Sequence, residues 1–230
     1  MCNFPFRQVD LRFGFKRGTS LIIDVWSDVV CPWCFIGRRR LQKGLAEFAH
    51  RDHVVVRHRA FQLQPEIDEV VPTTKYLARK YGAPESKIAE MQANVCAIAD
   101  GEGLCYKLDE TMSGNTVDAH RLLLMAGEIG KQDELLEAMF HGYFEAGKSL
   151  FTPGDLLAMT DEVGIDHELA RSLLVSNQYR EQVAEDARMA HSLGANGVPF
   201  FVFDTKYGIS GAQPLETFVQ TLEAAWKESA

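Results

Sequence analysis

The fold can be worked out from the segment Leu21-Ile22-Ile23-Asp24-Val25-Trp26-Ser27-Asp28-Val29-Val30-Cys31-Pro32-Trp33-Cys34. The apolar, β-branched run over residues 21–26 predicts a buried strand. After Cys34, apolar side chains recur at nearly helical spacing as far as Phe48, which predicts a helix that ends near His50. The two cysteines therefore stand where a strand ends and a helix begins. Pro32 suits the first turn of that helix, where no backbone N–H is needed.

The motif Cys31-Pro32-Trp33-Cys34 is a Cys-x-x-Cys pair, which at a strand–helix junction indicates redox chemistry. Backbone N–H groups and the positive end of the helix dipole favour a thiolate at Cys31. We expect Cys31 to be an exposed nucleophile. We expect Cys34, one turn further in and partly covered, to close a disulfide with it.

A structural zinc site is the alternative for this pair. It would need about two more soft ligands at a compatible spacing. Apart from Cys2 near the N-terminus, the other cysteines are Cys96 and Cys105, which fall in a helical region. The redox interpretation is therefore favoured, and no metal is expected. Those two cysteines could pair with each other if the chain bends at Gly101 and Gly103, but free thiols are expected in a reducing cytosol.

Composition narrows the class of protein. A net charge of −8 argues against nucleic-acid binding, and no apolar run approaches the roughly 18 residues of a membrane helix. Residues 1–18 scatter charges among aromatics and contain no apolar core of a secretory signal. Five cysteines among 230 residues do not form a disulfide framework, so a cytoplasmic protein is expected.

The order of predicted elements is β-α-β, a helical block, then β-β-α. A second strand over residues 54–61 should run parallel to the first, because a helix connects them. Helical patterns then follow one another from residue 73 to 193, the last of them over residues 177–193. A strand over residues 198–203, a short partner over 207–211 and a last helix after Pro214 complete the chain. We expect an N-terminal extension (1–18), one domain built from 19–65 and 189–230, and a helical insertion (66–188).

This order resembles an α/β thioredoxin fold with a large all-helical insertion, and more narrowly the DsbA-like oxidoreductases of the FrnE type. The resemblance covers the chain from Leu21 to Trp226. The segments that carry it are Ser27-Asp28-Val29-Val30-Cys31-Pro32-Trp33-Cys34, Phe61-Gln62-Leu63-Gln64-Pro65, Asn115-Thr116-Val117-Asp118-Ala119-His120-Arg121, Gly197-Val198-Pro199-Phe200-Phe201 and Ser210-Gly211-Ala212-Gln213.

The resemblance implies that the Val198–Pro199 bond is cis and faces the active-site disulfide. The backbone of Val198 would then be available to pair with an extended substrate chain beside Cys31. An ordinary trans proline at a strand start is the alternative.

The resemblance also places the segment with Asn115 and His120 beside the active site. His120 could line a substrate pocket, or simply bond a neighbouring segment. Asn115 could contact substrate, or simply cap a helix. Trp33 would offer an apolar rim to substrate, and the run Arg38-Arg39-Arg40 either holds an anion or forms a solvated face.

Thiol chemistry predicts the mechanism. Cys31 attacks a substrate disulfide and Cys34 releases the product through a mixed disulfide. The expected function is a thiol–disulfide oxidoreductase, with isomerase activity as an extension. It would act on protein or small-molecule disulfides as a monomer or homodimer, without a cofactor other than its own disulfide or glutathione as co-substrate.

Two other functions compete with this one. The first is a glutathione-dependent isomerase or transferase on small aromatic molecules, similar to 2-hydroxychromene-2-carboxylate isomerase and kappa-class glutathione transferase. Those relatives typically carry a serine at the position of Cys31, so the retained cysteine pair favours the oxidoreductase. The second is a binding module or chaperone whose cysteines are idle.

Overall fold

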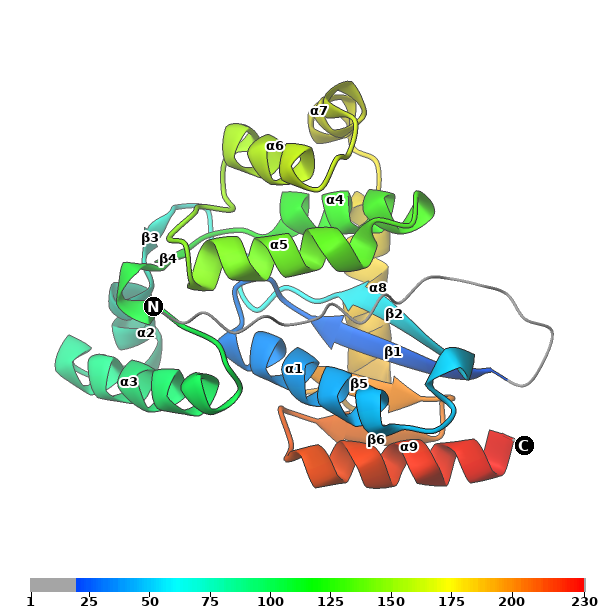
Figure 1. Ribbon diagram of the computed structural model, residues 1–230. Helices are drawn as coiled ribbons and strands as arrows, with labels where there is room; N and C mark the ends of the chain where they lie inside the picture. The colour runs from blue at the N-terminus through cyan, green and yellow to red at the C-terminus, as the bar shows by residue number, and fades with distance from the viewer. Residues whose placement is uncertain (1–19, 230) are drawn as a thin grey trace. The chain divides into compact units, whose positions relative to one another are not determined.

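The computed structural model describes residues 20–229. Within these residues the chain forms two compact units, which are described separately (Figure 1). The helical unit is Gln64–Glu181, and the sheet unit combines residues 20–63 with 182–229. The expected extension over residues 1–18 lies outside the described residues.

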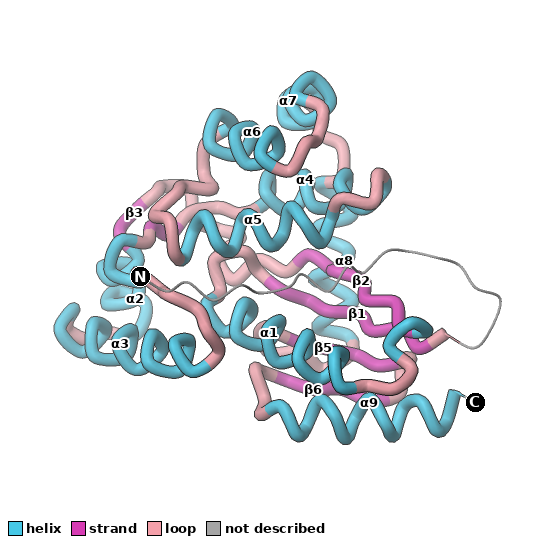
Figure 2. The backbone as a smooth tube through the Cα atoms, viewed as in Figure 1, coloured by secondary structure: helices cyan, strands magenta, loops and turns pink. Residues whose placement is uncertain are grey.

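The sheet unit contains a mixed sheet of four strands among the described residues: β1 (Leu21–Ser27), β2 (Val54–Ala60), β5 (Phe200–Phe203) and β6 (Tyr207–Ser210). Their order across the sheet is β2-β1-β5-β6 (Figure 2). β1 and β2 are parallel, whereas β5 runs antiparallel to both β1 and β6. The predicted fold class, with its β-α-β and β-β-α halves, is therefore confirmed.

Helices cover both faces of this sheet. Because side chains alternate along a strand, Leu21, Ile23 and Val25 face one side of β1 and Trp26 the other. The first side packs against α1 (Pro32–Glu47) and α9 (Leu215–Ser229), and the second against α8 (Arg180–Ser192). The central strands, buried on both sides, form a rigid support for the loop that carries the cysteines.

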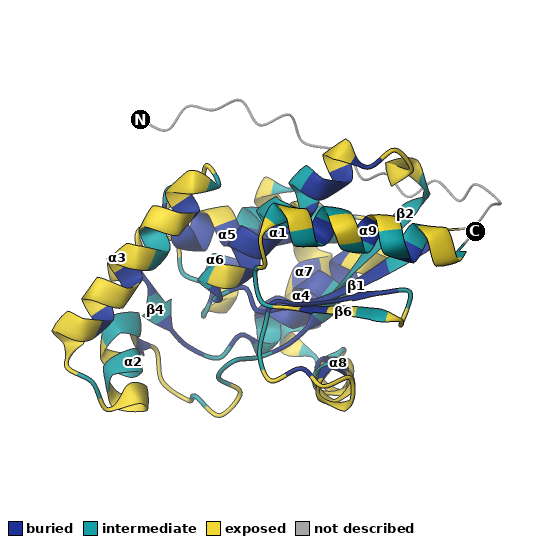
Figure 3. Cartoon of the chain, turned by 90° about the horizontal axis from the view of Figure 1, so that it is seen from below, coloured by how far each residue is buried: buried dark blue, intermediate teal, exposed yellow. Residues whose placement is uncertain are grey.

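The helical unit contains α2 (Thr73–Tyr81), α3 (Glu85–Gly101), α4 (Val117–Glu128), α5 (Gln132–Phe144), α6 (Pro153–Glu162) and α7 (His167–Val175). Its core is formed largely by α4 and α5, whereas α3 is exposed along most of its length (Figure 3). A short antiparallel pair, β3 (Val71–Pro72) with β4 (Met112–Ser113), was not expected, because two-residue strands carry no periodic signal. Short 3₁₀ turns occur at Arg51–His53 and Leu108–Glu110.

Several element boundaries differ from the expectation by one to three residues; α1, for example, ends at Glu47 and not near His50. β5 begins at Phe200, not at residue 198, directly after the Val198–Pro199 cis bond. α8 begins at Arg180, not at residue 177, because Tyr179 has a φ of 64°, which no right-handed helix accommodates. Among the helices of residues 20–229, none combines the length and apolar character needed to cross a bilayer.

Candidate active site at the start of α1

The two cysteines are held in a tight turn at the start of α1. Cys31 is the N-cap residue, with extended backbone angles, and Pro32 is the first helical residue. The N–H of Cys31 donates to the carbonyl of Asp28 at 3.0 Å, and the N–H of Cys34 donates to the carbonyl of Cys31 at 3.0 Å. The strand–helix junction predicted from the sequence is therefore confirmed.

Both thiols are free and buried. Cys34 is 2% exposed, as expected for the inner cysteine. Cys31 is only 4% exposed, so the expectation of an exposed nucleophile was wrong. Its sulfur contacts the carbonyl oxygen of Val198, 167 residues away, and local sequence cannot anticipate that cover.

The pKa of Cys34 is raised well above its ordinary value. Burial is the main cause, because it disfavours the charged thiolate. The hydrogen bond with Cys31 and the charges of Cys31 and Asp28 raise it further. Cys34 is therefore held as a neutral thiol at neutral pH.

The Val198–Pro199 peptide bond is cis, as the resemblance implied. The carbonyl oxygen of Val198 lies 3.6 Å from the Cys31 sulfur, which donates to it. The carbonyl of Pro199 accepts from the N–H of Gly211 at 2.8 Å. The structure thus brings Cys31, Cys34 and the Val198–Pro199 bond together within the sheet unit.

The sequence motifs assigned no role to Asp28, which the structure places beside the cysteine turn. Its side chain is fully buried, and Oδ2 accepts from the N–H of Leu63 at 2.7 Å. Its own carbonyl meanwhile holds the N–H of Cys31. Asp28 therefore ties the cysteine turn to the chain that follows β2. The partner is 35 residues away, so no local pattern reveals it.

The side chains of the run Arg38-Arg39-Arg40 contact other parts of the sheet unit, and a role of the run toward an anion stays a prediction. Arg38 is buried and lies 3.2 Å from a ring nitrogen of His58. Arg39 stacks over the ring of Phe35 and donates to Gln42, both on α1. Arg40 donates to backbone carbonyls after β6.

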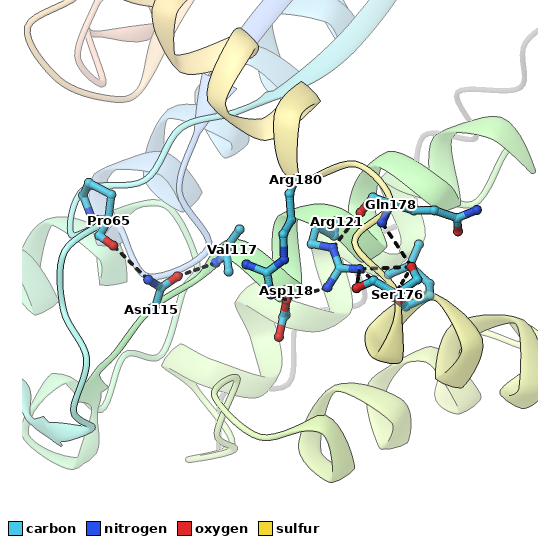
Figure 4. A network of polar contacts seen from close by, with 9 residues as sticks. Pro65, Asn115, Val117, Asp118, Arg121, Ser176, Gln178 and Arg180 are labelled. Carbon is cyan, nitrogen blue, oxygen red and sulfur yellow. Dashed lines mark hydrogen bonds and ion pairs between the residues drawn. The ribbon is translucent and has the colours of Figure 1, made fainter.

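Asn115 and His120 lie in the helical unit. Asn115 accepts from the N–H of Val117, the first residue of α4, and donates to the carbonyl of Pro65 at 2.9 Å (Figure 4). Asn115 thus bonds the helix start from one residue before the N-cap, which is Thr116 and not Asn115 as expected, and its role in substrate binding stays a prediction. His120 is 2% exposed on α4, and its role toward substrate is likewise a prediction.

The remaining predictions concern the two tryptophans near the motif, the second cysteine pair and a metal site. Trp33, between the two cysteines, is 36% exposed and available to a substrate, whereas Trp26 is core. Cys96 is a free thiol, so the pairing considered between it and Cys105 is not formed. Among the described residues no cluster of side chains is suited to hold a metal ion.

Comparisons with known proteins agree with this geometry. A model of the DSBA-like thioredoxin domain matches residues 22–223. A probable DsbA oxidoreductase from Streptomyces coelicolor is 42% identical, with a TM-score of 0.87, and the match covers 90% of this chain and 91% of that one.

More distant structures share the fold alone. A cytosolic disulfide reductase, DsbM from Pseudomonas aeruginosa, is 16% identical with a TM-score of 0.61, covering 90% of this chain and 98% of that one. A 2-hydroxychromene-2-carboxylate isomerase is 17% identical with a TM-score of 0.61, covering 90% and 95%. A comparison with curated proteins found no match. From the domain match, the cysteine turn and the cis proline beside it, we conclude that this chain belongs to the family of the DSBA-like thioredoxin domain.

Proposed function

We propose that this protein is a thiol–disulfide oxidoreductase of the FrnE type, with isomerase activity as an extension of the same chemistry. The observation that carries the proposal is the position of Cys31. It begins a helix, has Cys34 one turn away, and lies against the carbonyl beside a cis proline. This arrangement suits attack on a disulfide followed by intramolecular release.

In the reductive direction, the Cys31 thiolate attacks one sulfur of the substrate disulfide. A bond forms between Cys31 and that sulfur, the substrate S–S bond breaks, and the other sulfur leaves as a thiolate that takes up a proton. Cys34 then loses its proton and attacks the sulfur of Cys31. The Cys31–Cys34 disulfide forms, the second substrate thiol leaves, and two electrons have passed from the cysteine pair to the substrate.

The environment of Cys34 supports an ordered sequence of steps. Because burial raises its pKa, Cys34 stays protonated while Cys31 reacts first. Oxidation of a substrate is the same sequence in reverse, starting from the enzyme disulfide.

The proposed substrates are protein disulfides, with small-molecule disulfides as an alternative. Val198 would pair with an extended peptide through its backbone, and Trp33, partly exposed beside Cys31, would offer an apolar contact. Cysteine usage favours the cytoplasm as the compartment, and either a monomer or a homodimer would serve this chemistry.

The glutathione-dependent isomerase is the second candidate. The similarity to 2-hydroxychromene-2-carboxylate isomerase supports the shared fold alone, at 17% identity. A buried resolving thiol, Cys34, has no use in chemistry on bound glutathione. The cysteine pair therefore favours the oxidoreductase.

Reduction of insulin by dithiothreitol tests the proposal. We expect the wild type to accelerate the reaction and Cys31→Ser to abolish the acceleration. Cys96→Ser is the matched control, because it removes a free thiol of the helical unit and should keep full activity. An inert wild type that instead binds glutathione would favour the isomerase. Equal activity in Cys31→Ser and the wild type would favour a binding module or chaperone in which the two cysteines carry out no chemistry.

A further inference from the structure

Arg40, on α1, bridges to a distant loop through its guanidinium group. Its Nη1 donates to the carbonyl of Ala212 at 2.6 Å and to that of Gln213 at 3.3 Å. These carbonyls lie between β6 and α9, more than 170 residues along the chain. A charged donor bonded to carbonyls forms stronger bonds than a neutral one, so the contact restrains this loop against α1.

The same loop is bonded to the cis proline. Gly211 donates its N–H to the carbonyl of Pro199 at 2.8 Å, which continues the pairing of Phe200 with Ser210 by one step. Gly211 has a φ of 80°, a conformation that glycine adopts without strain. Movement of the loop at Ala212 would therefore be passed to Pro199 through one intervening residue.

Pro199 itself is in close contact with α1. A Cβ atom added at Gly37 would lie 3.1 Å from Cγ of Pro199 and 3.6 Å from Cβ of Ala212. Together with the contact of Cys31 to Val198, α1 meets segment 198–213 at three places along its length. These are its N-cap at Cys31, the close approach at Gly37 and the bridge from Arg40.

We infer that Arg40 is a positioning residue, which fixes the Val198–Pro199 backbone relative to Cys31 through the Gly211–Ala212 loop. The inference rests on the proposed function, because it assigns to Arg40 the presentation of an extended peptide disulfide to the Cys31 sulfur. A peptide substrate that pairs with the Val198 backbone needs this backbone to be aligned with the Cys31 sulfur. A small disulfide that contacts only the Cys31 sulfur does not need that alignment.

The test compares two substrates of the full-length protein, an extended peptide disulfide and bis(2-hydroxyethyl) disulfide. We expect Arg40→Ala to lower kcat/KM for the peptide about tenfold, mainly through KM, as the loss of a charge-assisted hydrogen bond implies. The rate with the small disulfide should change by less than about twofold, since Cys31 and Cys34 are untouched. Arg40→Lys should give a kcat/KM for the peptide between those of the wild type and Arg40→Ala, because lysine keeps the charge but loses the planar guanidinium group.

Arg39→Ala is the matched control. It removes the same charge from the same helix, and its contacts include Phe35 and Gln42 on α1 itself, so we expect both substrates to be unaffected. An equal loss on both substrates in Arg40→Ala, or the same peptide defect in Arg39→Ala, would overturn the inference. If the wild type reduces both substrates and Arg40→Ala matches it, only the inference fails. If the wild type reduces neither, the proposed function and the inference fail together.

Discussion

The sulfur of Cys31 lies 3.6 Å from the carbonyl oxygen of Val198, although 167 residues separate the two in sequence. This contact joins the first segment of the sheet unit to the second, which the sequence of the helical unit separates along the chain. Because the cysteine turn and the cis proline come from separate strands, the site depends on the correct pairing of β1 with β5.

Removal of Cys34 should trap the reaction halfway. Without the resolving thiol, the bond between Cys31 and the substrate has no internal attacker, so Cys34→Ala should accumulate a mixed disulfide with a peptide disulfide substrate. Mass spectrometry without reductant would detect the added mass. The double variant Cys31→Ser/Cys34→Ala should form no adduct, and an adduct in that variant would place the nucleophile elsewhere.

The stability of the reduced protein should fall as pH rises above the ordinary thiol range. The unfolded chain loses the Cys34 proton near its ordinary pKa of 9.0, whereas the folded protein retains it, because burial raises that pKa. The unfolded state then binds fewer protons, so the free energy of unfolding decreases with pH in this window. The stability that the neutral Cys34 thiol contributes is fully present below the ordinary thiol pKa. It is lost as the pH rises through the raised pKa of Cys34 in the folded protein.

Urea unfolding of the dithiol form at pH values of about 8 and about 10, on either side of the ordinary pKa, measures this effect. The stability difference between the wild type and Cys34→Ala should change between the two conditions. A difference that stays constant with pH would show that Cys34 titrates normally in the folded protein.

The close approach at Gly37 should be sensitive to a single added carbon. In Gly37→Ala the new Cβ would lie 3.1 Å from both Pro199 and Phe201, which forces the helix and the proline apart. We expect a loss of about 1–3 kcal/mol in the free energy of unfolding, measured by urea denaturation. Gly101→Ala is the control, since nothing lies within 4 Å of its added Cβ, and it should be neutral or stabilising.

Arg121 should stabilise the helical unit through its buried guanidinium group. Its fully buried guanidinium donates to the carbonyls of Gln178, Leu173 and Ser176 and to the carboxylate of Asp118 (Figure 4). Arg121→Met would leave these acceptors without their donor, at a cost of about 3–5 kcal/mol in the free energy of unfolding.

Urea unfolding followed by circular dichroism would measure that loss. Arg171→Met is the matched control, because Arg171 pairs only at the surface with Glu168, three residues away on the same helix. Equal stability of the two variants would contradict a structural role for Arg121.

Features that depend on neighbours in sequence could be predicted. The cysteine turn, α1 and the parallel pairing of β2 with β1 follow from an apolar strand, a helical repeat and a connection that contains a helix. The start of α8 was misplaced, because the left-handed conformation of Tyr179 is imposed by its surroundings and not by its residue type.

By itself, the sequence determined the identity of the reactive pair, the order of the elements and the resemblance that implied a cis proline, because these depend on residue type, spacing and local periodicity. Only the tertiary structure decided that Cys31 is covered by Val198, that the carboxylate of Asp28 holds Leu63 and that Arg40 holds Ala212. Each of these contacts joins residues at least 35 positions apart. Such contacts form only when the packing of strands and helices brings the partners within hydrogen-bond distance.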